Sequence, residues 1–132
     1  FVAGLDAGYG YNTFPLMGGR LVPPGIFTTQ PIVEAALNHP AGVQFGHRVL
    51  GTLLLTAAVV LAWRARRADV DPRSRRYAFG LAGGVASQYL LGVLTLLYLV
   101  PIPIAVTHQA VALLLLGWTV AWFHHLRDVR AA

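Results

Sequence analysis

The chain has 132 residues, of which 56% are hydrophobic and only 11% are charged. A soluble domain carries roughly 25% charged residues, so this composition argues for a membrane protein. The absence of cysteine excludes disulfides, Fe–S clusters and thiolate zinc sites. The net charge of +5 comes mainly from arginines at the ends of apolar runs, which argues against a nucleic-acid-binding surface.

The first 42 residues contain no apolar run long enough to cross a membrane. Residues 1–7 begin apolar and without a cap, and we expect them to be the end of a truncated helix, in a chain that lacks an N-terminal portion. Residues 8–42 are rich in Gly, Pro, Asn and Thr and are expected to form an outer loop. Within this loop, Pro31–Leu37 is expected to form a short interfacial helix with the proline in its first turn.

Three apolar runs follow, and each has about the 20 residues that a membrane-spanning helix needs. Lipid offers the backbone no hydrogen-bond partners, so these runs should be helical. The expected transmembrane helices span residues 43–64, 77–100 and 102–124. Small residues favour close packing of such helices, so Gly83, Gly84 and Ser87 should lie at helix–helix contacts. The predicted fold class is all-α, an integral membrane helix bundle with three complete transmembrane helices plus the end of a fourth.

The arginines predict how the bundle is oriented. The 64–76 loop carries six arginines, whereas the 8–42 loop carries one. Cytoplasmic loops of membrane proteins collect Lys and Arg. We therefore expect the 64–76 loop and the C-terminus to lie in the cytoplasm, and the 8–42 loop to lie outside.

Two histidines stand out, because ionisable residues inside a membrane are costly and are candidates for function. His47 lies four residues into the first run and His108 six residues into the third, and both helices enter from outside. At about 1.5 Å rise per residue, their depths differ by roughly 3 Å. Two imidazoles at matched depth suit the axial positions of one heme iron. One turn after each histidine comes a small residue, Gly51 or Ala112, which would make room for a flat macrocycle.

Other polar residues near the runs are open to several interpretations. Arg48 lies near the outer interface, where its guanidinium could pair with a heme propionate. A single histidine near a helix end is usually a hydrogen-bonded interfacial residue, and we expect this of His124 and His125, which point about 100° apart. His39 is expected to be an ordinary loop residue. Zinc or non-heme iron would want further ligands, and no acidic residue lies within the three runs.

Several segments, taken together and in order, resemble heme A synthase in the form found in alphaproteobacteria and mitochondria. They are Phe1–Gly8, Tyr11–Gly18, Val43–Arg48 and His108–Gln109. Gly46 stands where the family has Asp or Asn. The resemblance covers essentially the whole chain and implies the C-terminal four-helix half, residues 1–132, of a pseudo-symmetric eight-helix protein.

The resemblance implies an oxidoreductase of the bacterial inner membrane. This enzyme oxidises the C8 methyl of heme O to a formyl group, giving heme A for cytochrome oxidase. The second half of such proteins holds a b-type heme, so His47 and His108 would be the axial ligands of its iron, with Arg48 beside it. The catalytic residues would lie in the missing first half, so none is expected here and this chain alone would be inactive.

The implied partners are the first half of the same protein, the lipid bilayer, heme O synthase and an electron acceptor, with no nucleic acid. Two alternatives stay open from the residues alone. One is a non-enzymatic bis-His cytochrome b module that only transfers electrons. The other is a structural membrane subunit whose histidines lie at the interface by chance. An absorbance spectrum separates the structural subunit from the other two, and heme O turnover separates the enzyme from the electron carrier.

Overall fold

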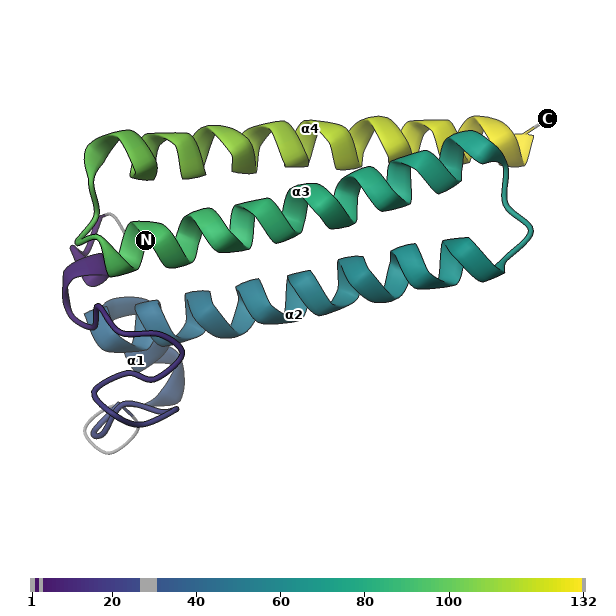
Figure 1. Ribbon diagram of the computed structural model, residues 1–132. Helices are drawn as coiled ribbons and strands as arrows, with labels where there is room; N and C mark the ends of the chain where they lie inside the picture. The colour runs from purple at the N-terminus through teal and green to yellow at the C-terminus, as the bar shows by residue number, and fades with distance from the viewer. Residues whose placement is uncertain (1, 3, 27–30, 132) are drawn as a thin grey trace.

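The computed structural model describes residues 2, 4–26 and 31–131, and every regular element among them is a helix. Three long helices, α2 (Pro40–Arg67), α3 (Pro72–Leu97) and α4 (Ile102–Ala131), run antiparallel side by side with α3 in the middle (Figure 1). A 3-10 helix, η1 (Ala7–Tyr9), and the short α1 (Ile32–Asn38) lie at the end of this layer where α2 starts (Figure 1). The arrangement confirms the all-α fold class.

All three long helices have the length and apolar composition to cross a bilayer, over Pro40–Arg67, Pro72–Leu97 and Ile102–Arg127. Their most apolar windows are almost entirely uncovered by the rest of the chain, with at most 11% of any window buried. A helix that is apolar on its outward faces is stable when lipid or another apolar surface covers it. The chain is therefore a multi-pass membrane protein.

Each long helix extends beyond the apolar run that predicted it, α2 at both ends, to Pro40 and Arg67, and α3 and α4 at one end. The helix α2 begins at Pro40 rather than at residue 43, and α3 begins at Pro72 rather than at residue 77. The cause is capping: His39 Nδ1 and Asp71 Oδ1 each accept first-turn backbone N–H groups, and a proline at the first helical position fits that geometry. The apolar run marks only the part of the helix in lipid, whereas the helix continues to its cap.

The other helix boundaries also differ from the predicted ones. The helix α3 ends at Leu97 rather than at residue 100, because Leu99 and Val100 adopt left-handed φ angles of 61° and 58° and a proline follows them. The helix α4 continues to Ala131 rather than ending at residue 124. Its last turns carry arginines and are polar, so hydropathy alone could not place this end.

The N-terminal segment is not the end of an α-helix. Residues 2 and 4–6 form turns that lead into η1, and Asp6 has a left-handed φ of 49°, while Phe1 and Ala3 lie outside the described residues. Glycines at short intervals prevent a continuous helical run there. The 8–42 segment is not all loop, because it contains α1 and the first turn of α2. The predicted short helix after Pro31 is confirmed.

The part of the chain before α2 (residues 4–26 and 31–39), here called the outer segment after its predicted location, packs on the start of α2 through a small apolar core. Ile26, Ala35 and Ala41 form this core, and Tyr11 and Phe45 pack against it. Any Cβ on Gly42 would collide with the carbonyl oxygen of Ala35. The close crossing of α1 over α2 therefore depends on glycine at position 42.

Glycines of α3 receive large side chains of α4. A Cβ on Gly84 would collide with Leu115, so the predicted helix–helix contact at Gly84 is confirmed. The prediction is wrong for Gly83 and Ser87 within the described chain. Both are exposed, and a Cβ on Gly83 would meet nothing within 4 Å. Adjacent helix residues point about 100° apart, so Gly83 and Gly84 cannot both face α4.

Candidate functional site

His47 on α2 and His108 on α4 come together near the ends of the bundle where both helices begin. Their ring centroids are 6.3 Å apart, and the ring planes lie at 76° to one another. Two nitrogens on opposite sides of one metal ion are about 4 Å apart, because each His–metal bond is about 2 Å. The ring centroids lie behind those nitrogens, so the observed separation fits two ligands of one metal.

The middle helix α3 positions His108 through Gln88 and Gly92. Gln88 Nε2 donates a hydrogen bond of 2.8 Å to the His108 backbone carbonyl and lies 3.5 Å from the ring nitrogen Nε2. A Cβ on Gly92 would lie 3.0 Å from His108 Cε1, so this glycine allows the ring to rest against α3. The second ring nitrogen, Nδ1, is buried without a hydrogen-bond partner. Gln88 was visible in the sequence only as a polar residue within a span, and its role follows from the packing.

The surroundings of His47 are different from those predicted. Gly51, one turn further on, faces the ring of Tyr89, to which a Cβ would lie 3.7 Å away. The Tyr89 hydroxyl and Thr52 Oγ1 are 2.9 Å apart and share a hydrogen bond, and Phe14 meets the Tyr89 ring edge-on. The small residue at 51 thus makes room for a tyrosine of α3. His47 itself is exposed.

Arg48 is engaged by the outer segment. Its two terminal nitrogens donate to four backbone carbonyl oxygens, at 2.9, 2.9, 3.2 and 3.5 Å. The acceptors belong to Tyr11, Thr13, Pro15 and Leu16. Gln44, one turn earlier on α2, donates to the same Tyr11 oxygen at 2.9 Å. Only Nε of the Arg48 guanidinium is buried without a partner, so most of its donors hold the loop rather than face the histidines.

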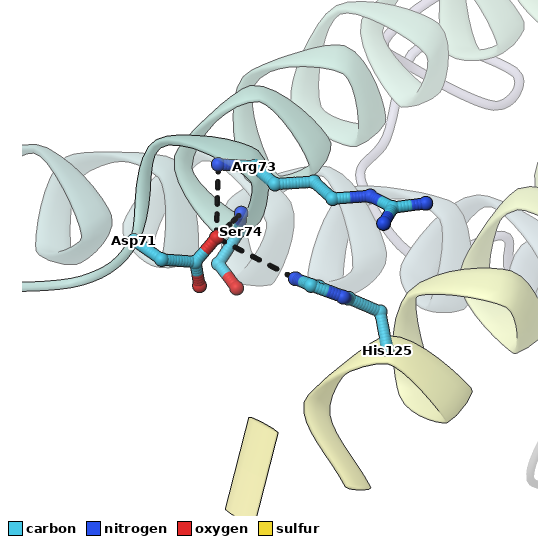
Figure 2. Close-up of polar contacts among 4 residues, drawn as sticks. All are labelled: Asp71, Arg73, Ser74 and His125. Carbon is cyan, nitrogen blue, oxygen red and sulfur yellow. Dashed lines mark hydrogen bonds and ion pairs between the residues drawn. The ribbon is translucent and has the colours of Figure 1, made fainter. Parts of the chain in front are cut away.

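The remaining histidines have capping and interfacial positions. His39, predicted to be an ordinary loop residue, caps α2 by accepting the Ala41 N–H at 3.2 Å. His125 Nε2 lies 3.5 Å from the Asp71 carboxylate at the opposite end of the bundle (Figure 2), and His124 is exposed. His124 and His125 therefore both lie far from the His47–His108 pair.

Asp71 is held in its ionised form by its neighbours. The Ser74 hydroxyl and the Ser74 N–H lower the pKa of its carboxyl to about 2, with smaller contributions from His125 and the Arg73 N–H. The two backbone donors are each 2.9 Å from Oδ1 (Figure 2). The helix N-terminus also favours a negative charge.

The histidine pair lines neither of two cavities that lie at opposite ends of the bundle. One, of about 240 Å³, lies at the outer end and is lined by apolar residues that include Ile26, Phe45 and Val49. The other, of about 380 Å³, lies between α3 and α4 at the arginine-rich end. No group of three or more His, Cys, Asp or Glu side chains gathers within the described chain.

Comparison with known proteins agrees with the resemblance seen in the sequence. Residues 1–120 match the COX15-CtaA family, described as cytochrome oxidase assembly protein. A protein named heme A synthase from Rhodospirillum centenum (strain ATCC 51521 / SW) is 44% identical over 127 residues, covering 96% of this chain and 34% of that protein. No solved structure matches the chain.

Eukaryotic proteins named heme A synthase COX15 match equally well. The human protein is 43% identical over 129 residues, covering 98% of this chain and 32% of its own length. The Arabidopsis thaliana protein is 40% identical over 127 residues, covering 96% of this chain and 28% of its own length. The chain thus spans about a third of the length of these relatives. Because the family model matches nearly all of its residues, the chain belongs to the COX15-CtaA family of cytochrome oxidase assembly proteins.

Proposed function

We propose that this chain is the b-heme-binding half of a heme A synthase, with His47 and His108 as the two axial ligands of the iron. The supporting observation is that the two rings, on separate helices and at similar depth, have centroids 6.3 Å apart. The relatives named heme A synthase support the assignment of the overall activity. The whole protein would oxidise the C8 methyl of heme O to a formyl group, giving heme A for cytochrome oxidase.

The donor set fits a heme better than an isolated metal ion. A heme iron needs only two protein ligands, whereas zinc and non-heme iron sites use three or more His, Cys or carboxylate groups. The described residues bring two imidazoles together and no third ligand of that kind. When bound, the b-type heme would supply one-electron redox chemistry to the protein.

The residues around the pair would orient the ligands and shield them. Gln88 fixes the backbone at His108 through its hydrogen bond of 2.8 Å, and Gly92 leaves room for the ring. Arg48, the neighbour of His47 in sequence, holds residues 11–16 against α2 through four carbonyls. Its Nε–H, which is buried without a partner, would be available to a propionate.

We also propose that a second half of the protein completes the enzyme, because the chain spans about a third of the length of its relatives. That half would hold the substrate and the catalytic residues. The protein would lie in a bacterial inner membrane, with the α2–α3 loop and the C-terminus in the cytoplasm. An electron acceptor and heme O synthase would be its partners.

Absorbance spectroscopy of the protein expressed from its complete reading frame tests the heme site. His47→Ala and His108→Ala should each abolish the low-spin spectrum of one heme, because a single imidazole leaves the iron without its sixth ligand. His124→Ala is the matched control on α4 and should keep the wild-type spectrum. A wild-type amount of low-spin heme in either variant would contradict the proposal. Heme binding without heme O turnover would favour the electron-transfer module instead.

A further inference from the structure

A second group of polar residues lies at the arginine-rich end of the bundle, away from the histidine pair. The cavity of about 380 Å³ there is lined by Arg73, Arg76, Tyr77, Gly80, Trp118 and Ala121. Its volume falls in the range of small-molecule pockets, roughly 300–1,000 Å³. The proposed heme function uses none of these residues.

The cavity carries positive charge that the described chain does not neutralise. Arg73 and Arg76 are three residues apart on α3, so their side chains share one helix face. The Asp71 carboxylate lies 3.5 Å from His125 Nε2 and pairs with neither arginine side chain. Figure 2 shows that Arg73 meets Asp71 only through its backbone N–H, while its guanidinium points away from the carboxylate. An anion in this cavity would find two guanidinium groups.

Two aromatic residues, Tyr77 and Trp118, line the cavity beside the arginines and are held in place. Trp118 Nε1 donates to the Tyr77 carbonyl at 3.4 Å, and the two rings meet edge to face with centroids 5.5 Å apart. A Cβ on Gly80 would lie 2.7 Å from Trp118 Cζ2, so glycine is what lets the indole lie against α3. The cavity therefore has a cationic part and a preformed apolar part.

The position of the cavity indicates which kind of anion it accepts. It lies near the start of α3 and in the second half of α4, toward the arginine-rich ends of two membrane-spanning helices. Trp and Tyr at such ends lie at the level of the lipid headgroups. Basic pockets between transmembrane helices at this level bind anionic headgroups. A soluble anion would use the arginines but would gain nothing from the apolar wall.

We propose that this cavity binds one anionic phospholipid. The phosphate pairs with the guanidinium groups of Arg73 and Arg76, and the glycerol and upper acyl chains lie along Gly80, Trp118 and Ala121. The site joins α3 to α4 at the end of the bundle opposite the histidines. It does not depend on the heme assignment.

Native mass spectrometry tests the proposal on the protein expressed from its complete reading frame and purified in a neutral detergent. Phosphatidylglycerol and phosphatidylcholine are titrated in parallel, and the bound lipid is counted. The variant Arg73→Gln with Arg76→Gln should weaken phosphatidylglycerol binding about 30-fold. Each arginine beside an anionic headgroup contributes a factor of about five to six in affinity, and the variant removes two. The matched control, Arg64→Gln with Arg66→Gln, removes the same charge from the end of α2, outside the cavity, and should leave the affinity nearly unchanged.

Three results would overturn the proposal. These are equal binding of the two lipids, equal weakening by the two double variants, and displacement of phosphatidylglycerol by inorganic phosphate. Ala121→Trp provides a second test that keeps every charge, because the large ring fills the cavity and should also displace the lipid. The heme spectrum and thermal unfolding should match wild type in each variant, which separates lost binding from lost folding.

Discussion

Arg48 illustrates how one residue on a membrane helix can organise a segment outside the membrane. Four backbone carbonyls accept hydrogen bonds from its terminal nitrogens. An irregular loop offers such carbonyls few backbone donors, and Arg48 supplies donors to all four from one side chain. The planar guanidinium serves several acceptors at once in a way that no other side chain can.

We predict that Arg48→Gln loosens residues 11–16 and destabilises the protein by about 1–3 kcal/mol, the cost of losing charge-assisted hydrogen bonds. Limited proteolysis in this segment and thermal unfolding measure the effect. The stability of Arg48→Lys should lie between that of wild type and that of Arg48→Gln, because an ammonium is a point donor without the guanidinium fork. Arg64→Gln, at the far end of α2, is the control. Unchanged protease resistance in Arg48→Gln would contradict this account.

Asp71 makes the stability of the α3 cap depend on pH. Its pKa is about 2 in the folded chain, below the value of about 3.9 for an unperturbed Asp. A depressed pKa means that the ionised carboxylate stabilises the folded state above about pH 4, and that this contribution is lost as pH falls through about 2. The thermal unfolding temperature should therefore fall more steeply with acidification in wild type than in Asp71→Asn. The asparagine keeps a capping side chain but carries no charge.

Asp69→Asn is the control for this titration, because Asp69 accepts no hydrogen bond within the described chain. The unfolding temperature of Asp69→Asn should depend on pH as that of wild type does. Parallel curves for wild type and Asp71→Asn between about pH 4 and pH 2 would show that the cap does not titrate as described.

At the scale of the elements, α3 determines how the bundle is built. It packs against both α2 and α4, and its glycines accept Trp118, Leu115 and His108. Between helices in lipid, close packing replaces the hydrophobic effect as the attractive force, so small residues at the contact are needed. The same helix contributes Gln88 to the histidine site and Arg73 to the cavity at the other end.

The adjacent glycines 83 and 84 give a matched test of this packing. Gly84→Leu should destabilise the bundle by about 1–3 kcal/mol or more, because the new side chain would overlap Leu115. Gly83→Leu adds the same atoms where a Cβ meets nothing within 4 Å, and it should cost much less. Thermal unfolding in detergent, with heme content as a second readout, compares the two. Wild-type stability in Gly84→Leu would contradict the packing.

At the scale of the whole molecule, the three helices form one layer with a different chemistry at each end (Figure 1). The end where α2 and α4 begin carries the histidine pair and the outer segment. The opposite end carries the arginines, the aromatic wall and the Asp71 cap. Arginine-rich ends of membrane bundles face the cytoplasm.

We predict that a green fluorescent protein fused after Arg130 is fluorescent, and that alkaline phosphatase fused there is inactive. The arginine asymmetry between the two ends is the reason, because basic loops resist translocation. A fusion of alkaline phosphatase within residues 18–22, in the outer segment, is the control and should be active. Active phosphatase at the C-terminus would reverse the orientation.

Much of the fold followed from the sequence, because the bilayer limits what a membrane chain can do. Apolar runs of about 20 residues must be helices that cross it, and three such helices are present. The fixed rise of a helix also placed His47 and His108 at similar depth, and the structure brings their rings together. Capping residues outside the runs moved the helix starts, which hydropathy could not detect.

Only the tertiary structure decided how each helix is rotated and what covers it. A helix that is apolar on nearly all sides has no strong periodic signal to say which side faces its neighbours. For this reason the sequence could not separate Gly84, at the α4 contact, from Gly83 on an open face. Nor could it show that Arg48 turns to the carbonyls of the outer segment, or that Gln88 meets His108. Those contacts depend on the path of the loop and on the placement of α3 between α2 and α4, which are set by packing between residues far apart in the chain.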